Sequence, residues 1–178
     1  MGIHKLMSLI EEKAPKAIKE IQLDMLTGKV VAIDASMAIY QFLISTQTLS
    51  KGYGVTELRD KDGNLTGHLV GLLNRSLTLL DNGVKPVWVF DGKPPELKSG
   101  ELEERKERKR KAEEDYEMAK EEGDLEAAQK LAQRTIRISP EMIKDAKKML
   151  ELAGIPIIEA PTEAEAQCAQ LVKDEIAY

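Results

Sequence analysis

Short, nearly continuous apolar segments alternate along the chain with segments that are apolar on only one helical side. Three of the continuous segments are rich in β-branched or aromatic residues: residues 30–33, 87–90 and 155–158. Such segments are typical of strands that are buried on both faces. The pattern therefore predicts three strands inside a sheet.

Two segments next to these strands have the spacing of amphipathic helices. Residues 65–80 and 142–152 place leucine, isoleucine or methionine on one helical face. Gly83 and Gly154 follow them as C-cap signals, and Ser139 precedes the second as an N-cap signal. Alternating strands and helices predict an α/β fold with a mostly parallel central sheet and right-handed crossovers.

Two polar segments do not fit this core pattern. Residues 45–64 contain glycine and many polar residues, so we expect a long surface loop there, of a kind that often has a function. Residues 98–137 are highly charged and nearly free of large apolar residues. A helix that is polar on all sides is not a core helix.

The charges of the second segment are grouped by sign. Residues 105–111 hold six basic residues and one acid, whereas residues 112–126 hold eight acids and one base, and Gly123 divides two helix-favouring halves. One interpretation is a solvated hairpin with salt-bridged faces. A second is an arch of two helices that presents a basic face to a phosphate backbone. A third is a nuclear localisation signal at residues 108–111.

Composition narrows the class of protein. A length of 178 residues with 42% hydrophobic residues suits one folded domain. No apolar segment approaches the roughly 18 residues of a membrane span, and the first residues lack a signal-peptide pattern. The single cysteine, Cys168, excludes an internal disulfide and favours a reducing, intracellular compartment. The net charge of -5 does not exclude a nucleic-acid ligand, because the distribution of charge matters more than its sum.

Acidic residues follow all three predicted strands. Asp34, Asp91 and Glu159 come directly after them, and Glu163 and Glu165 follow shortly afterwards. In open parallel sheets, ligands bind outside the carboxyl ends of the strands. Carboxylates gathered there repel one another unless a hard divalent cation such as Mg²⁺ joins them. The arrangement therefore predicts metal-assisted phosphoryl chemistry.

Each acid also has a purely structural interpretation. Asp34 precedes a helix and would cap it, Asp91 precedes a glycine and would form a turn, and Thr162 with Glu165 matches a capping box. Residues two apart on a helix do not share a face. Glu163 and Glu165 therefore both serve metals only if the helix begins there, or if one acts through water.

Several stretches, in order along nearly the whole chain, closely resemble flap endonucleases of the XPG-like nuclease family, of eukaryotic type. They are Met1-Gly2-Ile3 and residues 31–37, 40–44, 89–95, 98–102, 154–156 and 160–166. The resemblance implies a three-layer, PIN-like 5′-nuclease fold with a charged helical arch over about 98–137. It also implies 5′-flap endonuclease and 5′-3′ exonuclease activity on DNA in replication and repair, with two Mg²⁺ ions per complete site and Mn²⁺ as a substitute.

The resemblance further assigns roles to individual residues. The metal ligands would be Asp34, Asp91, Glu163 and Glu165. The catalytic cations would be Lys98 and Arg105, which are seven residues apart and so on one helical face. The residues in contact with DNA would be Gly2, Tyr40, Arg75 and Glu163, with Tyr40 stacked on a base and Arg75 on a backbone phosphate.

Without the resemblance, several of these residues have simpler interpretations. Tyr40 would be a core residue of the helix after the first strand, and Arg75 an exposed helix cation. Lys98 and Arg105 would be solvated charges on a polar helix. His68 shares a helix with leucines, so we predict a packing role for it and no role in chemistry.

The family pattern extends beyond what these 178 residues contain. We expect residues 1–178 to be the N-terminal nuclease region. A strand with an Asp-x-Asp pair, a later Asp, a DNA-gripping helical module with a potassium ion, and a clamp-binding tail would lie outside it. On that expectation the fragment alone is inactive, and an uncovered sheet edge favours a homodimer or strand exchange.

The resemblance also implies partners and a location for the full-length protein. Its partners would be branched DNA with a 5′ flap and a sliding clamp, and it would have no membrane partner. It would be located in the nucleus, and also in the nucleolus and mitochondrion.

Two other classes of function stay open. The missing acids also suit a non-catalytic, truncated module that binds DNA or itself. The fold pattern alone also fits a PIN-like ribonuclease or a strand-end-Asp phosphohydrolase. The latter usually needs Asp-x-Asp at the first strand, where Ser36 occupies the second acidic position.

Overall fold

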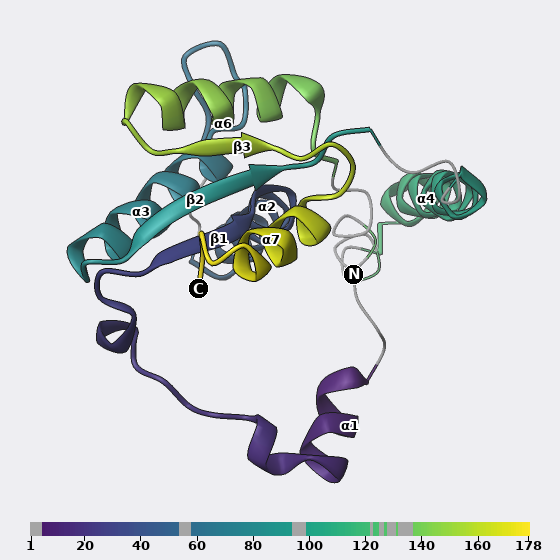
Figure 1. The fold of residues 1–178 in the computed structure, drawn as a ribbon. Helices are drawn as coiled ribbons and strands as arrows, with labels where there is room; N and C mark the ends of the chain where they lie inside the picture. Colours follow the sequence, from purple (N-terminus) through teal and green to yellow (C-terminus); the bar gives the residue numbers. More distant parts are fainter. Residues whose placement is uncertain are drawn as a thin grey trace.

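A computed structural model describes most of the chain. The described residues are 5–53, 58–93, 99–121, 123, 124, 127, 131 and 137–178. Within the helices, the side chains at 46–53, 99, 101–103, 105, 106 and 109 are outside the description. In the described part, three parallel strands form a sheet with helices packed on both of its faces (Figure 1).

The strands lie in the order β1-β2-β3, and neighbouring strands are parallel. They are β1 (Val30–Asp34), β2 (Lys85–Phe90) and β3 (Ile157–Glu159). The register pairs Asp34 with Val89 and Phe90 with Glu159, so all three strands end at one edge. The three predicted strands and their parallel arrangement are confirmed, although the third begins two residues later than its apolar segment.

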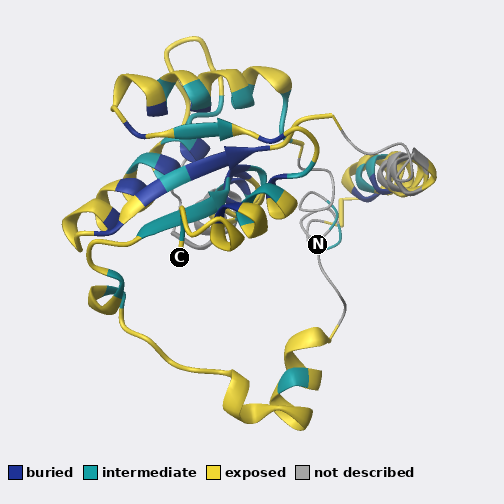
Figure 2. Cartoon of the chain, in the orientation of Figure 1, coloured by how far each residue is buried: buried dark blue, intermediate teal, exposed yellow. Residues whose placement is uncertain are grey.

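The central strand is the most buried one (Figure 2). Trp88, Val89 and Phe90 are almost completely inaccessible to solvent. Successive side chains of a strand point to opposite faces, so a strand in the middle of three layers must be apolar at consecutive positions. The buried indole of Trp88 donates to the Ser76 hydroxyl (2.9 Å), which in turn donates to the Leu72 carbonyl (2.8 Å).

Helices on one face of the sheet enclose the larger core. They are α2 (Ala35–Tyr53), α3 (Gly67–Asp81) and α6 (Pro140–Leu152). This core includes Trp88 and Phe90. As predicted, Ser139 caps α6, since its hydroxyl accepts the Met142 N–H (3.2 Å).

A single described helix, α7 (Ala164–Lys173), packs on the opposite face. Its buried residues Ala164 and Leu171 form a second core with Val89, and Ala32 and Ile158 pack against this cluster. Alternation along the strands therefore divides their residues between two cores. The α/β fold class is confirmed.

The segment 45–64 is not one long loop, so that prediction is wrong. Helix α2 continues to Tyr53, and residues 58–66 form a tight hairpin in which Arg59 and Leu65 make an antiparallel bridge. The Asp60 carboxylate accepts the backbone N–H groups of Asp62 (2.9 Å) and Asn64 (2.8 Å). Local side-chain hydrogen bonds thus order a polar segment that has no hydrophobic pattern.

The charged segment begins with one long helix, α4 (Ser99–Glu121), which lies away from the sheet, beyond the ends of the strands (Figure 1). It ends as predicted near Gly123, whose φ of 74° is left-handed, and the Asp124 N–H reaches back to the Ala119 carbonyl (3.0 Å). Most of residues 122–136, where the second arch helix is predicted, lie outside the described residues.

The N-terminal part is α1 (Leu6–Lys13) followed by two short 3-10 helices, η1 (Pro15–Ala17) and η2 (Leu23–Leu26). None of these three elements contains a buried residue, and α1 stands apart from the sheet (Figures 1 and 2). None of the described helices has both the length and the apolar surface needed to cross a bilayer.

Candidate metal centre

Asp34 and Asp91 lie on the face of the sheet that α7 covers. Ala32 and Val89 belong to the α7 core, and each acid is two positions further along its chain. The Asp34 carboxylate accepts the Met37 N–H (3.0 Å) in the first turn of α2. The capping interpretation of Asp34 is therefore confirmed, and this bond fixes the orientation of its carboxylate.

Asp91 makes a bond that links distant parts of the chain. Its carboxylate accepts the N–H of Ala164, the first residue of α7, at 2.9 Å. Glu163 is the N-cap residue, with an extended backbone and no side-chain capping bond of its own. The predicted capping box on Thr162 is wrong, because the helix begins after Glu163 and the acceptor comes from the end of β2.

This arrangement answers the spacing problem of the two glutamates. Glu163 is half-buried at the N-cap position and Glu165 is exposed in the first turn. Both carboxylates thus sit where α7 begins, before the helical repeat can separate them onto different faces. The positive end of the helix also favours negative charge at these positions.

Three of the acids act electrostatically on one thiol. Burial raises the pKa of the Cys168 thiol on α7, and the negative charges of Asp34, Asp91 and Glu165 raise it further. Those three carboxylates come from β1, the end of β2 and α7. Each of the three carboxylates therefore lies within electrostatic range of the Cys168 thiol.

The strand-end acid of β3 does not join them. Glu159 has the same orientation as Ile157 and lies on the opposite face, where it pairs with Lys147 of α6. The Lys147 ammonium also lies 5.2 Å from the centre of the Phe90 ring. Ile157 packs against the larger core, and Glu159 ends the same strand two residues later. Strand alternation therefore directs the Glu159 side chain to the face of that core and away from Asp91.

The donor chemistry of the converging acids fits a hard divalent cation, which prefers oxygen ligands. Among the described residues, however, no three Asp, Glu, His or Cys side chains are grouped closely enough to hold a metal ion. Mg²⁺ keeps several waters and binds through only one or two carboxylates. In the described part of the chain these acids therefore do not form a closed protein cage for a metal.

The predicted DNA-contacting residues differ in how far the structure describes them. Tyr40 is 41% exposed on α2, which excludes the core-packing interpretation. Arg75 is exposed on α3, and its guanidinium lies 5.6 Å from the centre of the Phe42 ring, a contact that the sequence did not indicate. Gly2 and Lys98 lie outside the described residues, and Arg105 belongs to α4 but its side chain is not described.

The packing role predicted for His68 is confirmed. Its side chain is 1% exposed, and neither ring nitrogen has a hydrogen-bond partner among the described residues. Burial lowers its pKa, while the Asp145 carboxylate and the Met142 backbone act in the opposite direction. His68 belongs to the packing around α3 and takes no part in the candidate site.

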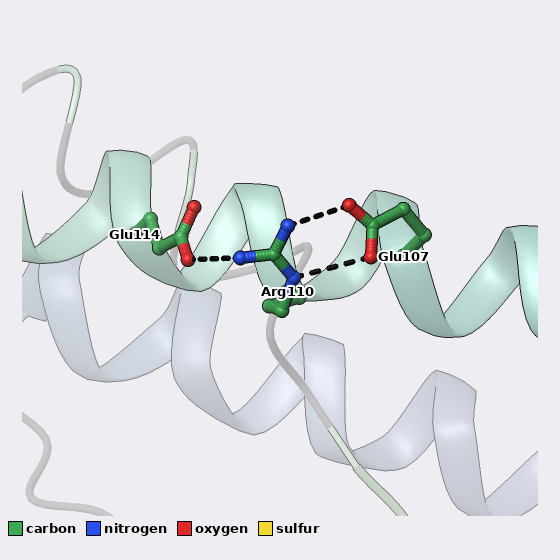
Figure 3. Close-up of polar contacts among 3 residues, drawn as sticks. All are labelled: Glu107, Arg110 and Glu114. Carbon is green, nitrogen blue, oxygen red and sulfur yellow. Dashed lines mark hydrogen bonds and ion pairs between the residues drawn. The ribbon is translucent and has the colours of Figure 1, made fainter.

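Ion pairs within α4 occupy part of its basic cluster. Arg110 binds Glu107 through two nitrogens and Glu114 through a third (Figure 3). The hydrogen bond from Arg110 lowers the pKa of Glu107, and the two glutamates raise the pKa of Arg110. Arg108 pairs with Glu104 (2.8 Å). For these residues the salt-bridged interpretation is confirmed.

Comparison with known families matches residues 1–112 to the XPG N-terminal domain and residues 154–178 to the XPG I-region. Flap endonuclease 1 of Tetrahymena thermophila is 56% identical over 173 residues, which are 97% of this chain and 45% of that protein. Flap endonuclease 1 of Plasmodium knowlesi is 51% identical over 178 residues, which are 100% of this chain and 29% of that protein. The chain thus spans less than half the length of these relatives.

Solved structures give the same result for the fold. The catalytic core of Rad2 in complex with DNA substrate superposes with a TM-score of 0.63 at 32% identity, over 99% of this chain and 44% of that one. Flap endonuclease-1 from Methanococcus jannaschii gives a TM-score of 0.60 at 38% identity, over 89% of this chain and 49% of that one.

Proposed function

The chain belongs to the XPG family, and on that premise we propose that its full-length protein is a metal-dependent, structure-specific 5′-flap endonuclease and 5′-3′ exonuclease. The observation that carries the proposal is geometric: Asp34 and Asp91 lie at the ends of two paired parallel strands on the face that α7 covers, and the Asp91 carboxylate bonds to the first residue of α7, beside Glu163 and Glu165. Asp34 and Asp91 each cap a helix, and a divalent cation bound to these carboxylates would also offset their mutual repulsion.

The proposed cofactor is Mg²⁺, with Mn²⁺ as a substitute. Asp34, Asp91, Glu163 and Glu165 are its proposed ligands in this chain. When bound, the metal supplies an activated water and neutralises charge on the phosphate. The protein holds two of the carboxylates in place before the metal binds, since Asp34 accepts from the start of α2 and Asp91 from the start of α7.

The remaining proposed roles concern the DNA. Tyr40 is exposed and available to stack on an unpaired base, which contributes about 1–3 kcal/mol in single-strand recognition. Arg75 presents a guanidinium to a backbone phosphate from a position fixed against the Phe42 ring. Lys98 and Arg105 are proposed to stabilise the charge of the scissile phosphate, and Gly2 to lie beside them.

The proposal is tested with the full-length gene product and a 5′-flap DNA in the presence of Mg²⁺. Cleavage at the flap junction is expected, and Asp34→Asn should abolish it. Glu159→Gln is the matched control, because Glu159 also ends a strand but lies on the opposite face with Lys147. No cleavage by the parent protein, or equal loss in both variants, would contradict the proposal.

A second candidate is a non-catalytic module that binds DNA or a second copy of itself. It is favoured by the absence of a closed metal group among the described acids. If the 178-residue chain itself cuts flap DNA, and Asp91→Ala abolishes the cutting, this candidate fails. Light scattering decides whether the chain forms the proposed homodimer.

The place of the protein in the cell is also a proposal. A nuclear location, with the nucleolus and mitochondrion as further locations, and a sliding-clamp partner for the full-length protein both follow from the family likeness. Fluorescent tagging of the full-length gene product tests the location, and co-purification with the clamp tests the partner.

A further inference from the structure

The backbone crosses itself at very short range beside Asp91. A Cβ atom built on Gly92 would lie 2.0 Å from the Ala160 carbonyl oxygen and 2.8 Å from that of Pro161. Both distances are far below van der Waals contact, and the obstructing atoms belong to backbone. Only a glycine permits this crossing without moving the turn that precedes α7.

Hydrogen bonds on both sides of the crossing hold the two segments together. The Ala160 N–H donates to the Phe90 carbonyl (2.9 Å), and the Gly92 N–H donates to the Thr162 carbonyl (2.7 Å). Beyond them, the Asp91 carboxylate accepts the Ala164 N–H. The pairing of β2 with β3 thus continues past the end of β3, up to the first residue of α7.

The consequence concerns the glutamates at the start of α7. Glu163 lies between Thr162 and Ala164, and both of these residues are bonded to the 91–92 segment. The distance between the Asp91 and Glu163 carboxylates therefore depends on how closely the two backbones approach at Gly92. Widening the crossing would move Glu163 and Glu165 away from Asp91, together with Ala160 and Ala164 of the α7 core, and would leave the larger core on the other face in place.

Another glycine of the chain provides a contrast. At Gly71 a Cβ would meet the Phe42 ring at 2.4 Å, so that position is also crowded, but by a side chain that packs between α2 and α3 and lies outside the proposed metal centre. Substitution at Gly71 therefore reproduces the steric cost without touching the acids.

We propose that Gly92 is a positioning residue for the metal centre, which sets the separation between Asp91 and the Glu163/Glu165 pair through the close backbone crossing. This inference rests on the proposed metal-dependent function. Gly92 has no side chain that could bind a metal or substrate, and its proposed effect passes through the 160–163 turn.

The test compares Gly92→Ala with Gly71→Ala in the full-length gene product. Mn²⁺ binding is measured by the loss of the electron paramagnetic resonance signal of the free ion. Thermal unfolding is measured by circular dichroism, and flap cleavage is measured as a function of Mg²⁺ concentration. Gly92→Ala should weaken Mn²⁺ binding, and raise the Mg²⁺ concentration for half-maximal cleavage, by about 10- to 100-fold, the usual effect of losing support behind a metal ligand. Gly71→Ala should lower the melting temperature and change Mn²⁺ binding by less than about twofold, and Mn²⁺ binding is the measure compared between the two variants because the Phe42 ring also supports Arg75.

A second variant keeps the inference open to refutation if Gly92→Ala does not fold. Pro161→Gly loosens the same turn from the other side without adding an atom, and should weaken Mn²⁺ binding in the same direction. Unchanged Mn²⁺ binding in the folded variants, with cleavage intact in the parent, would overturn the role of Gly92 and leave the proposed nuclease standing. If the parent protein binds no Mn²⁺, both the role of Gly92 and the proposed metal-dependent nuclease are overturned. If the parent binds Mn²⁺ but does not cleave the flap, and Gly92→Ala weakens that binding, only the proposed nuclease activity is overturned.

Discussion

At the scale of single residues, the acids of the candidate site have structural and proposed chemical roles at the same time. Asp34 caps the helix that follows it, and Asp91 caps a helix that begins 73 residues later. A carboxylate has two oxygens and can accept several bonds, so capping leaves capacity for a cation. A structural role for these residues therefore does not argue against a metal site.

The two roles of Asp91 can be separated by substitution. Asp91→Asn retains an oxygen that accepts the Ala164 N–H, so the free energy of unfolding should change by less than about 0.5 kcal/mol, because Asn and Asp cap helices about equally well. Asp91→Ala removes the acceptor and should cost about 1–2 kcal/mol. Both variants lose the charge and should lose flap cleavage in the full-length protein. Urea denaturation measures the first effect, and an equal loss of stability in both variants would refute the capping role.

At the scale of elements, α4 shows how a helix with no hydrophobic face is stabilised. Among its described residues, ion pairs at spacings of three and four connect Glu104 to Arg108 and connect Arg110 to glutamates on both sides. Such pairs stabilise exposed helices and are sensitive to salt. Arg137, just before α6, pairs with Glu113 and connects the end of the charged segment to the interior of α4.

Removing these pairs should loosen α4 in a graded manner. Arg110→Gln breaks contacts to two glutamates and Arg108→Gln to one, so amide hydrogen exchange in α4 should accelerate more in the first variant than in the second. In about 1 M salt, where charges are screened beyond roughly 3 Å, the differences should nearly vanish. Equal exchange in all three proteins at low salt would show that the ion pairs do not hold the helix.

At the scale of the whole molecule, the buried His68 connects stability to pH. Its folded-state pKa is lowered from 6.5, chiefly by burial. At pH values between the lowered folded-state pKa of His68 and 6.5, the unfolded chain binds more protons than the folded chain. The contribution of neutral His68 to the free energy of unfolding is therefore complete above pH 6.5 and is lost as the pH falls below 6.5.

Replacing His68 with leucine should remove this dependence. Neither nitrogen has a hydrogen-bond partner among the described residues, so leucine sacrifices no bond there and has a similar volume. The unfolding free energy of His68→Leu, measured in urea at about pH 7.5 and about pH 5, should fall less on acidification than that of the parent chain. Parallel decreases in the two proteins would show that His68 is not a source of acid sensitivity.

The sequence by itself determined the local elements and the positions of the acids. The apolar segments specified three parallel strands, the spacing of leucine, isoleucine and methionine specified α3 and α6, and Ser139 specified where α6 begins. These features depend on residues close together in the chain, which is why a pattern reveals them. The ordered hairpin at 58–66 was missed because its turn bonds involve polar residues with no hydrophobic period.

Only the tertiary structure decided which acids meet. Asp91 and Glu159 both follow strands, yet one lies against α7 and the other pairs with Lys147 on the opposite face. The cap from Asp91 to Ala164 and the crossing at Gly92 join segments that are far apart in the sequence, and no local pattern encodes such an approach. The physical reason is that strand alternation places successive side chains on opposite faces, but the packing of the layers decides what covers each face. Long-range backbone contacts likewise exist only in the assembled sheet.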